Sequence, residues 1–193
     1  MEKLPTTPSQ TIGPFFAYSL TAEQYGYHFN SLVNDKLVNG ETARGKIYIT
    51  GKVFDGAGNT IHDAMIELWQ ADTVGNYRSV SISKRNDDFT GFGRFGTGTT
   101  SNHSFTFQTI KPGSIGGQAP HINVLLFMRG SMHRLTTRLY FDDEKNDNDP
   151  LLNSVEPARR KTIIASKVIL NGAPAYEFNI FMQGENETVF FQL

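Results

Sequence analysis

Apolar and polar residues alternate along several short segments of the chain, beginning at Lys46. Ile47, Ile49 and Val53 fall on one face of an extended segment, and the residues between them are mostly polar. Because successive side chains of a strand point to opposite faces, this period of two predicts a half-buried β-strand. Comparable patterns predict further strands at 61–69, 103–107, 121–128, 136–141, 162–170, 175–181 and 188–193.

Turn signals rich in Gly, Asn and Asp separate these segments, most clearly at 55–59 and 75–76. The polar, Gly-rich stretch 79–100 predicts a long loop, and 157–161 could form a short helix. The acidic run 142–149 lacks the spacing of a calcium loop, so we expect a solvated loop there. Eight or nine short strands with almost no helical periodicity predict an all-β fold, an antiparallel β-sandwich.

The first 45 residues show no regular pattern and are predicted to form an N-terminal arm. Residues 6–16 contain two prolines and a glycine, which disfavours a continuous helix, yet Phe15, Phe16 and Tyr18 are apolar. Such an arm packs on the chain's own core or reaches a partner, and the pattern leaves both open. We expect one domain over 1–193, with the arm at 1–45.

The composition is typical of a globular protein, and it excludes several kinds of functional site. The 193 residues are 38% hydrophobic, and the formal net charge of −1 provides no basic field for nucleic acid or an anionic membrane. Because Cys is absent, disulfides and thiol nucleophiles are excluded. No apolar stretch is long enough to span a bilayer and no signal-peptide pattern is visible, so we expect a cytoplasmic protein.

A spaced pattern occupies 49–53, Gly58, Ile61, 66–68 and 75–77, and reads as strand, tight turn, strand and tight turn. Its glycines are expected at positions of positive φ. The pattern resembles the signature of the intradiol ring-cleavage dioxygenases, and nearly the whole chain takes part in the resemblance. Within that family it is most similar to the alpha subunits of protocatechuate 3,4-dioxygenases, through segments at 8–14, 120–123, 138–144 and 183–191.

The resemblance implies the sandwich fold of this family and an enzyme that opens the ring of protocatechuate with O2. The ring opens between the two hydroxyl-bearing carbons, which gives 3-carboxy-cis,cis-muconate. It also implies a large hetero-oligomer of alpha and beta subunits. In such enzymes Fe3+ is bound by two Tyr and two His of the beta subunit, so this chain is expected to carry no cofactor of its own.

The family's iron-ligand positions are only partly matched in this sequence. Its His-x-His pair, which places both side chains on one face of a strand, falls on His121 and Asn123. An amide is a poor ligand for ferric iron, and no Tyr occurs from 78 to 120, where the phenolate ligands are expected. Gln118 stands where the catalytic chain has an Arg. We therefore expect no catalytic residue and no metal site, with His121 a hydrogen-bonded histidine inside the sandwich and Asn123 a candidate partner.

Four residues are instead expected to bind substrate. Arg129 follows the apolar segment 121–128, where a charge must reach solvent, a partner or a ligand. Its planar guanidinium pairs well with a carboxylate. The resemblance places Arg129 at an active site shared by alpha and beta subunits, against the carboxylate of the substrate. It places Thr11, Gly13 and Pro14 in the lining of the same pocket.

Several alternatives remain open at this point. Arg129 could be an ordinary surface residue, and the arm residues could serve the conformation of the arm alone. The chain could be a purely structural partner that touches no substrate, or a stand-alone iron dioxygenase with an unusual ligand set. A sandwich module that binds carbohydrate or protein is a further alternative.

Overall fold

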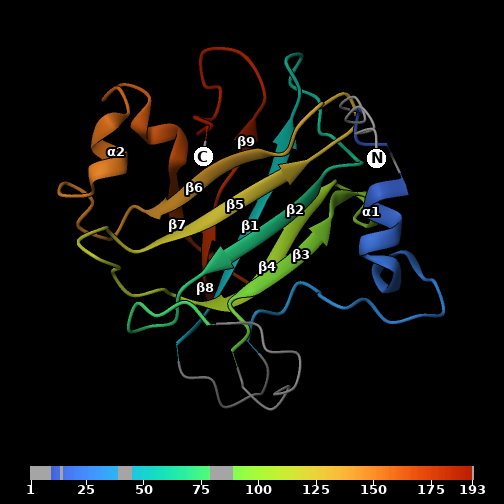
Figure 1. Cartoon of the computed structure of the whole chain (residues 1–193), viewed down its shortest axis with the longest axis horizontal. Helices are drawn as coiled ribbons and strands as arrows, with labels where there is room; N and C mark the ends of the chain where they lie inside the picture. Colours follow the sequence, from blue (N-terminus) through green and yellow to red (C-terminus); the bar gives the residue numbers. More distant parts are fainter. Residues whose placement is uncertain (1–9, 14, 39–44, 79–88, 193) are drawn as a thin grey trace, which may run out of the picture.

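The chain folds mainly into β-strands, as Figure 1 shows. A computed structural model describes residues 10–13, 15–38, 45–78 and 89–192. Its strands are β1 (Lys46–Phe54), β2 (Met65–Gln70), β3 (Phe92–Gly96), β4 (Ser104–Ile110), β5 (His121–Phe127), β6 (Leu135–Phe141), β7 (Ile164–Leu170), β8 (Ala173–Glu177) and β9 (Ile180–Phe181). Its helical elements are α1 (Phe15–Leu20), α2 (Pro150–Ser154) and the 3-10 turns η1 (Ala22–Tyr25), η2 (Thr97–Thr99) and η3 (Arg160–Ile163).

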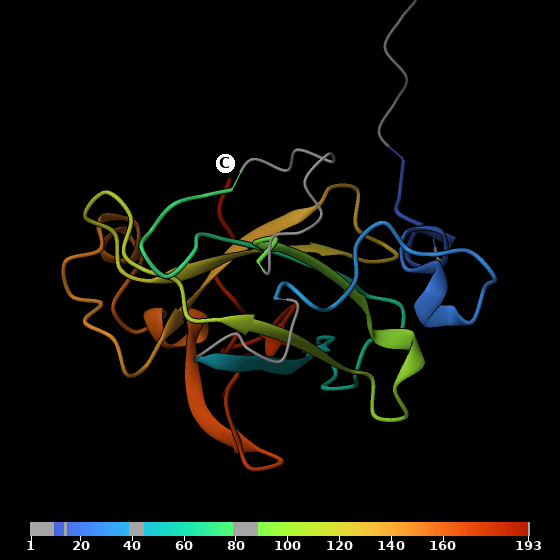
Figure 2. The same cartoon turned by 90° about the horizontal axis from the view of Figure 1, so that it is seen from below.

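The strands form two layers, which Figure 2 shows from the side. Strands follow the order β3-β2-β5-β6-β7-β8-β1-β4, and β9 pairs with β1. The β6–β7 pairing joins the layers through only two residue pairs, Tyr140 with Ile164 and Phe141 with Ala165. The predicted all-β sandwich is confirmed, although the β6–β7, β1–β8 and β1–β9 pairs are parallel, so the sheet is mixed.

The main core lies between the layers. Ile47, Ile49 and Val53 of β1 are buried on one face, as their alternation predicts. They share one hydrophobic cluster with Ile122 and Leu126 of β5, from the opposite layer. Each such side chain stabilises the fold by roughly 1.5–3 kcal/mol when fully buried, so this cluster holds the two layers together.

Glycine is required in the signature pattern for two different physical reasons. Gly58 and Gly75 have φ of +84° and +86°, as the sequence predicts for tight turns. Gly51 lies inside β1 and does not have positive φ, so the expectation for it was wrong. A Cβ at Gly51 would collide with the backbone carbonyl of Phe178 and with the ring of Phe105. Gly51 therefore permits a close approach of two backbones.

Strand β3 was missed by the sequence pattern, which predicted only a loop over 79–100. Its residues at 92–96 contain two glycines, a composition that strands usually avoid. The structure explains Gly93, because a Cβ there would collide with the side chain of Leu37. Packing against the segment 34–38 thus selects glycine in this strand, and residues 79–88 lie outside the described ranges.

The helical elements near the C-terminus differ from the predicted helix at 157–161. Helix α2 begins earlier because Asp149 accepts a hydrogen bond from the Leu152 backbone N–H at 2.8 Å and Pro150 follows as the first helical residue. The predicted strand 188–193 is reduced to one bridge between Thr136 and Phe191. None of the helices in the described ranges combines the length and apolar character needed to cross a membrane.

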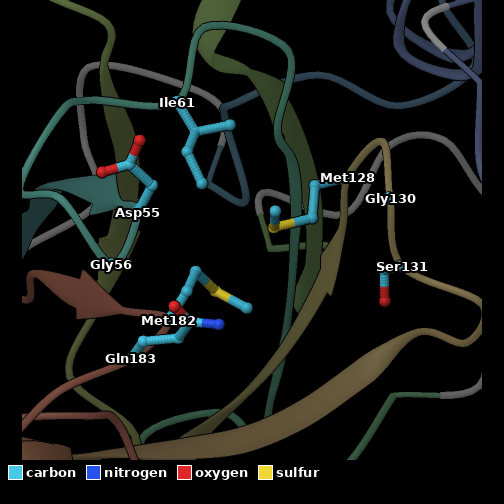
Figure 3. A pocket seen from close by; sticks show the side chains of 8 residues that line it. All are labelled: Asp55, Gly56, Ile61, Met128, Gly130, Ser131, Met182 and Gln183. Atoms are coloured by element: carbon cyan, nitrogen blue, oxygen red, sulfur yellow. The ribbon is translucent and has the colours of Figure 1, made fainter.

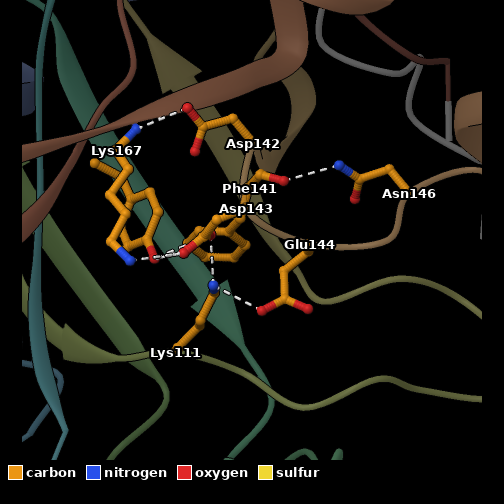
Figure 4. Close-up of polar contacts among 8 residues, drawn as sticks. Lys111, Phe141, Asp142, Asp143, Glu144, Asn146 and Lys167 are labelled. Carbon is orange, nitrogen blue, oxygen red and sulfur yellow. Dashed lines mark hydrogen bonds and ion pairs between the residues drawn. The ribbon is translucent and has the colours of Figure 1, made fainter.

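The acidic run 142–149 is not simply solvated, because its first residues pair with lysines (Figure 4). Lys111 Nζ lies 2.6 Å from Asp143 Oδ1 and 2.7 Å from Glu144 Oε1, and Lys167 Nζ lies 3.0 Å from Asp143 Oδ2. Lys111 also lies over the rings of Phe141 and Tyr176. These contacts connect the end of β4 to β6, β7 and β8, and therefore clamp one end of the sandwich.

The Asp143 clamp is expected to make stability depend on pH. Burial alone would raise the pKa of the Asp143 carboxyl, but hydrogen bonds from Lys111, Lys167 and Tyr176 outweigh it and hold the pKa at about 2. A lowered pKa in the folded state stabilises the fold above the unfolded value of 3.8, and this contribution is lost as pH falls towards 2. The melting temperature of wild type should exceed that of Asp143→Asn near neutral pH, and the difference should shrink on acidification.

Thermal denaturation of both proteins from about pH 6 to about pH 2 measures this effect. A difference in melting temperature that stayed constant over the whole range would show that the carboxylate charge does not contribute. The size of the effect is expected to be modest, because the side chains of Asp143 and Lys167 are partly exposed and screened by solvent.

Candidate functional site

Arg129 lies two residues beyond the end of β5, where the chain turns towards β6. Its Nε is 2.9 Å from Oδ2 of Asp63, and the exposed fractions of the two side chains are 56% and 10%. Oδ2 of Asp63 is buried and receives no well-aligned hydrogen bond from the described residues, so the contact is an ion pair without ideal hydrogen-bond alignment. The guanidinium is thus held at one edge and open to solvent elsewhere.

The N-terminal arm packs beside Arg129. Thr11 Oγ1 accepts a hydrogen bond from the Gly130 backbone N–H at 3.1 Å, and the Ile12 N–H donates to the Ser131 carbonyl at 3.2 Å. Gly13 is exposed and follows directly in the arm. The structure therefore brings Thr11 and Gly13 close to the turn that carries Arg129, whereas Pro14 lies outside the described residues.

A cavity of about 280 Å³ lies next to this turn (Figure 3). Met128 and Gly130, the two neighbours of Arg129 in sequence, line it. Ile61, Met128 and Met182 make its apolar walls and pack on the main core. Polar groups stand at its rim, from Asp55, Ser131 and Gln183. The cavity and the ion pair of Arg129 therefore both adjoin the turn at 128–131.

His121 lies on the outer face of β5 rather than inside the sandwich, which corrects the prediction. It is 1% exposed because residues around α2 cover this face with a second hydrophobic cluster that includes Tyr140 and Leu152. Its Nδ1 lies 2.8 Å from the Ala119 carbonyl, so Asn123 is not its partner. Burial lowers the pKa of His121 and the nearby charge of Arg138 lowers it further, which favours neutral imidazole.

Asn123 lies on the same outer face and joins two other side chains. Its Nδ2 donates to the Tyr77 hydroxyl at 2.7 Å, and its Oδ1 accepts from Arg138 Nε at 3.2 Å. Arg138 also donates through Nη1 to Gln118 Oε1 at 2.9 Å. The pairing registers place Arg138, Asn123 and Trp69 side by side on neighbouring strands. A guanidinium thus lies beside Asn123, the position where the resemblance leads us to expect a second His.

Tyr140 and Asp149 complete this polar cluster. The Tyr140 hydroxyl donates to Asp149 Oδ1 at 3.0 Å, and burial raises the pKa of Tyr140 to about 12, so it stays a neutral phenol. Asp149 is fully engaged, because its Oδ2 also accepts from the Ala119 N–H at 2.9 Å. These contacts hold the strand segment of His121 to the start of α2.

The donor set around His121 does not suit a ferric ion. A ferric site needs several anionic or imidazole ligands around one point, whereas here Asn123 holds the Tyr77 hydroxyl and the fixed cation of Arg138 lies next to it. A second cation at this distance would be repelled. The chemistry of these residues therefore does not fit a ferric site.

Tyr77 and Arg138 are site residues that the sequence pattern did not single out. The stretch in which phenolate ligands are expected begins at 78, directly after Tyr77, although Tyr77 ends the signature pattern and could have been found there. Arg138 belongs to a segment that carries the resemblance, but its contact with Gln118 depends on the pairing of β5 with β6. No signal in the sequence alone gives that register.

Comparisons with known proteins place the chain among the dioxygenases. A family model described as Dioxygenase matches residues 23–184. The chain is 44% identical over 197 residues to the protocatechuate 3,4-dioxygenase alpha chain of Burkholderia cepacia, with 100% of each chain covered. It is 40% identical to the alpha chain of Pseudomonas putida, covering 99% of this chain and 98% of the relative. With the beta chain of Burkholderia cepacia it shares 31% identity, over 86% of this chain and 77% of the relative.

Solved structures resemble the fold. The dioxygenase domain of a dioxygenase and carbohydrate-binding protein fusion from Streptomyces sp. SirexAA-E has a TM-score of 0.60 at 24% identity, covering 85% of this chain and 95% of that one. The 3-chlorocatechol 1,2-dioxygenase of Rhodococcus opacus 1CP has a TM-score of 0.55 at 21% identity, covering 81% and 69%. At these identities the similarity establishes the fold alone.

Proposed function

Since the chain belongs to the intradiol dioxygenase family, together with the alpha chains of protocatechuate 3,4-dioxygenase, we propose that it is the alpha subunit of such an enzyme. In this proposal it completes the substrate pocket of an iron-bearing beta subunit. The complex cleaves protocatechuate with O2 to 3-carboxy-cis,cis-muconate. The ferric ion belongs to the beta subunit and supplies the oxygen chemistry, while this chain supplies binding groups.

The observation that carries the proposal is the guanidinium of Arg129, which is paired at Nε and belongs to a side chain that is more than half exposed to solvent. Within the described residues only its Nε has a partner, Asp63, and the side chain is 56% exposed. Protocatechuate is an anion, and a guanidinium edge is the natural receptor for its carboxylate. Arg129 therefore binds the carboxylate, while Thr11, Gly13 and Pro14 line the same pocket from the arm. Support for the arm's role is its docking on Gly130 and Ser131.

A homologous beta chain is the proposed partner, in a large hetero-oligomer. Support comes from exposed apolar side chains within the N-terminal arm, since Phe15, Phe29 and Leu32 are 78%, 59% and 87% exposed. Several large apolar side chains exposed within one segment favour a protein interface. Met132, close to Arg129 in sequence, is also half exposed.

The test is co-expression of this chain with a candidate beta chain, followed by purification of the complex. We expect the two chains to co-purify and the complex to consume protocatechuate and O2 together. A beta chain with the same kcat and KM in the absence of this chain would contradict the proposal. The alternative of a structural partner that touches no substrate is separated by the kinetics of Arg129 variants, given in the Discussion.

A further inference from the structure

Asp63 is a nearly buried acid in the loop that precedes β2. Its side chain is only 10% exposed, and Oδ2 has no well-aligned hydrogen bond to the described part of the chain. A carboxylate removed from water needs a cation close by. Arg129, with Nε at 2.9 Å, is the cation that the structure places against this oxygen. The ion pair is therefore the reason that a charge can stand at this buried position.

The backbone around Asp63 is fixed by one buried residue, Thr97. Thr97 Oγ1 donates to the Ile61 carbonyl at 2.8 Å and accepts from the Ala64 N–H at 3.2 Å, and the Thr97 N–H donates to the Ala64 carbonyl at 2.9 Å. Thr97 itself has no exposed surface. The backbone on both flanks of Asp63 is thus held in place.

The turn that carries Arg129 is also held in place. Gly130 has a φ of +86°, and the Ser131 N–H donates to the Met128 carbonyl at 3.2 Å, which closes a tight turn. Thr11 of the arm accepts the hydrogen bond of the Gly130 N–H. The backbone of Arg129 is therefore constrained from both sides, and what remains to be ordered is its long side chain.

The geometry points to Asp63 as a positioning residue: its carboxylate holds Nε of Arg129 so that the two terminal amino groups face outwards to bind the carboxylate of an aromatic acid. The inference rests on the proposed function, in which Arg129 binds that carboxylate. The buried member of the pair lies at the inner edge of the guanidinium and the exposed member projects to the surface. The outer edge remains available for two parallel N–H···O bonds.

Two effects of Asp63 on substrate binding oppose each other. Its negative charge repels the substrate carboxylate, but the two carboxylates lie on opposite edges of the guanidinium and solvent at the exposed edge screens them. Its hold on Nε orders a flexible side chain in advance, which otherwise costs affinity when the ligand binds. We expect the ordering of the Arg129 side chain to outweigh the repulsion between the carboxylates, so removal of Asp63 should weaken substrate binding.

The experiment uses the complete alpha–beta enzyme with Asp63→Asn and Asp63→Ala. KM for protocatechuate should rise about two- to tenfold, with kcat little changed, as expected for the loss of one ordered side chain. The competitive inhibition constant of 4-hydroxybenzoate should rise by the same factor. That of phenol, which has no carboxylate, should stay unchanged. Asp143→Asn, which also removes a carboxylate from a cation pair, is the matched control and should leave all these constants unchanged.

The outcomes separate the inference from the function on which it rests. If Arg129→Ala raises KM but neither Asp63 variant does, the positioning role is overturned and the proposed function stands. If Arg129→Ala has no effect, the proposed function itself fails. If the inhibition constants of 4-hydroxybenzoate and phenol rose by the same factor, Asp63 would have a structural role and the inference would be overturned. The Asn variant keeps the size of Asp63, so the test remains decisive if Asp63→Ala does not fold.

The double variant Arg129→Ala with Asp63→Ala gives a second check. Because Asp63 acts through Arg129, the double variant should have the same KM as Arg129→Ala alone. A further rise in KM would mean that Asp63 contributes independently of Arg129, which contradicts the inference.

Discussion

Replacement of Arg129 by alanine in the alpha–beta enzyme is expected to raise KM for protocatechuate about 10- to 100-fold. The reason is the loss of charge-assisted hydrogen bonds to the substrate carboxylate, which are worth about 1.5–3 kcal/mol, where about 1.4 kcal/mol corresponds to a factor of ten. Because Arg129→Ala also leaves the nearly buried Asp63 carboxylate without its cation, some loss of stability is expected, and the kinetics are measured on complex whose folding is confirmed by its melting temperature. Steady-state kinetics of the purified complex measure the effect.

Arg129→Lys is the conservative variant for the same measurement. It keeps the charge but loses the planar fork, and the contact of Nε with Asp63 is also lost, so KM should fall between wild type and Arg129→Ala. If Arg129→Ala left both KM and kcat unchanged, Arg129 would have no role in substrate binding. The chain would then be better described as a structural partner of the beta subunit.

Gly51→Ala is expected to lower the free energy of unfolding by about 3 kcal/mol, the upper end of the usual range for overpacking. A new methyl group would meet the Phe178 carbonyl and the ring of Phe105, and the carbonyl is backbone that cannot turn aside. Relief would require β1 to separate from the chain next to it, where the Phe178 N–H donates to the Thr50 carbonyl at 2.8 Å. Denaturant unfolding of the chain, alone or in complex with its partner, measures the change.

Gly58→Ala is the matched control for this substitution. Gly58 has φ of +84° but open space where a Cβ would lie, so alanine there meets only the backbone strain of the left-handed region. That strain costs roughly 1–2 kcal/mol. If Gly51→Ala lowered the free energy of unfolding no more than Gly58→Ala does, the close approach of β1 to the backbone of Phe178 would not be the reason for glycine at position 51.

Much of the sandwich could be predicted because burial and alternation agree along its strands. In β1, Ile47, Ile49 and Val53 alternate with polar residues and are buried together. Strand β3 could not be predicted, since Gly93 is selected by contact with Leu37, a residue far away in sequence. Packing between distant segments overrides local propensity there.

Some residues of the candidate site could be proposed from the sequence, but their contacts could not. The Arg129 and Thr11 positions follow from the resemblance, but the ion pair with Asp63 joins segments 66 residues apart and leaves no local pattern. Likewise, the burial of His121 comes from α2 and its neighbours, which pack on the outer face of β5. Such contacts follow from topology and register, which the spacing of residues along the chain does not give.

The central claim is that this chain serves a dioxygenase without holding the iron. Asn123 in place of a second His, and the guanidinium of Arg138 beside it, are the observations that carry it. If the claim holds, the side of the complex that this chain forms should contribute substrate contacts through Arg129 and no metal ligand.

The most direct test is a measurement of iron and ring-cleaving activity in this chain alone and in its complex with a beta chain, both prepared with iron supplied. The account predicts background iron and no activity for the chain alone, and iron in proportion to the beta chain, with activity, for the complex. Stoichiometric iron together with ring cleavage in the isolated chain would contradict it.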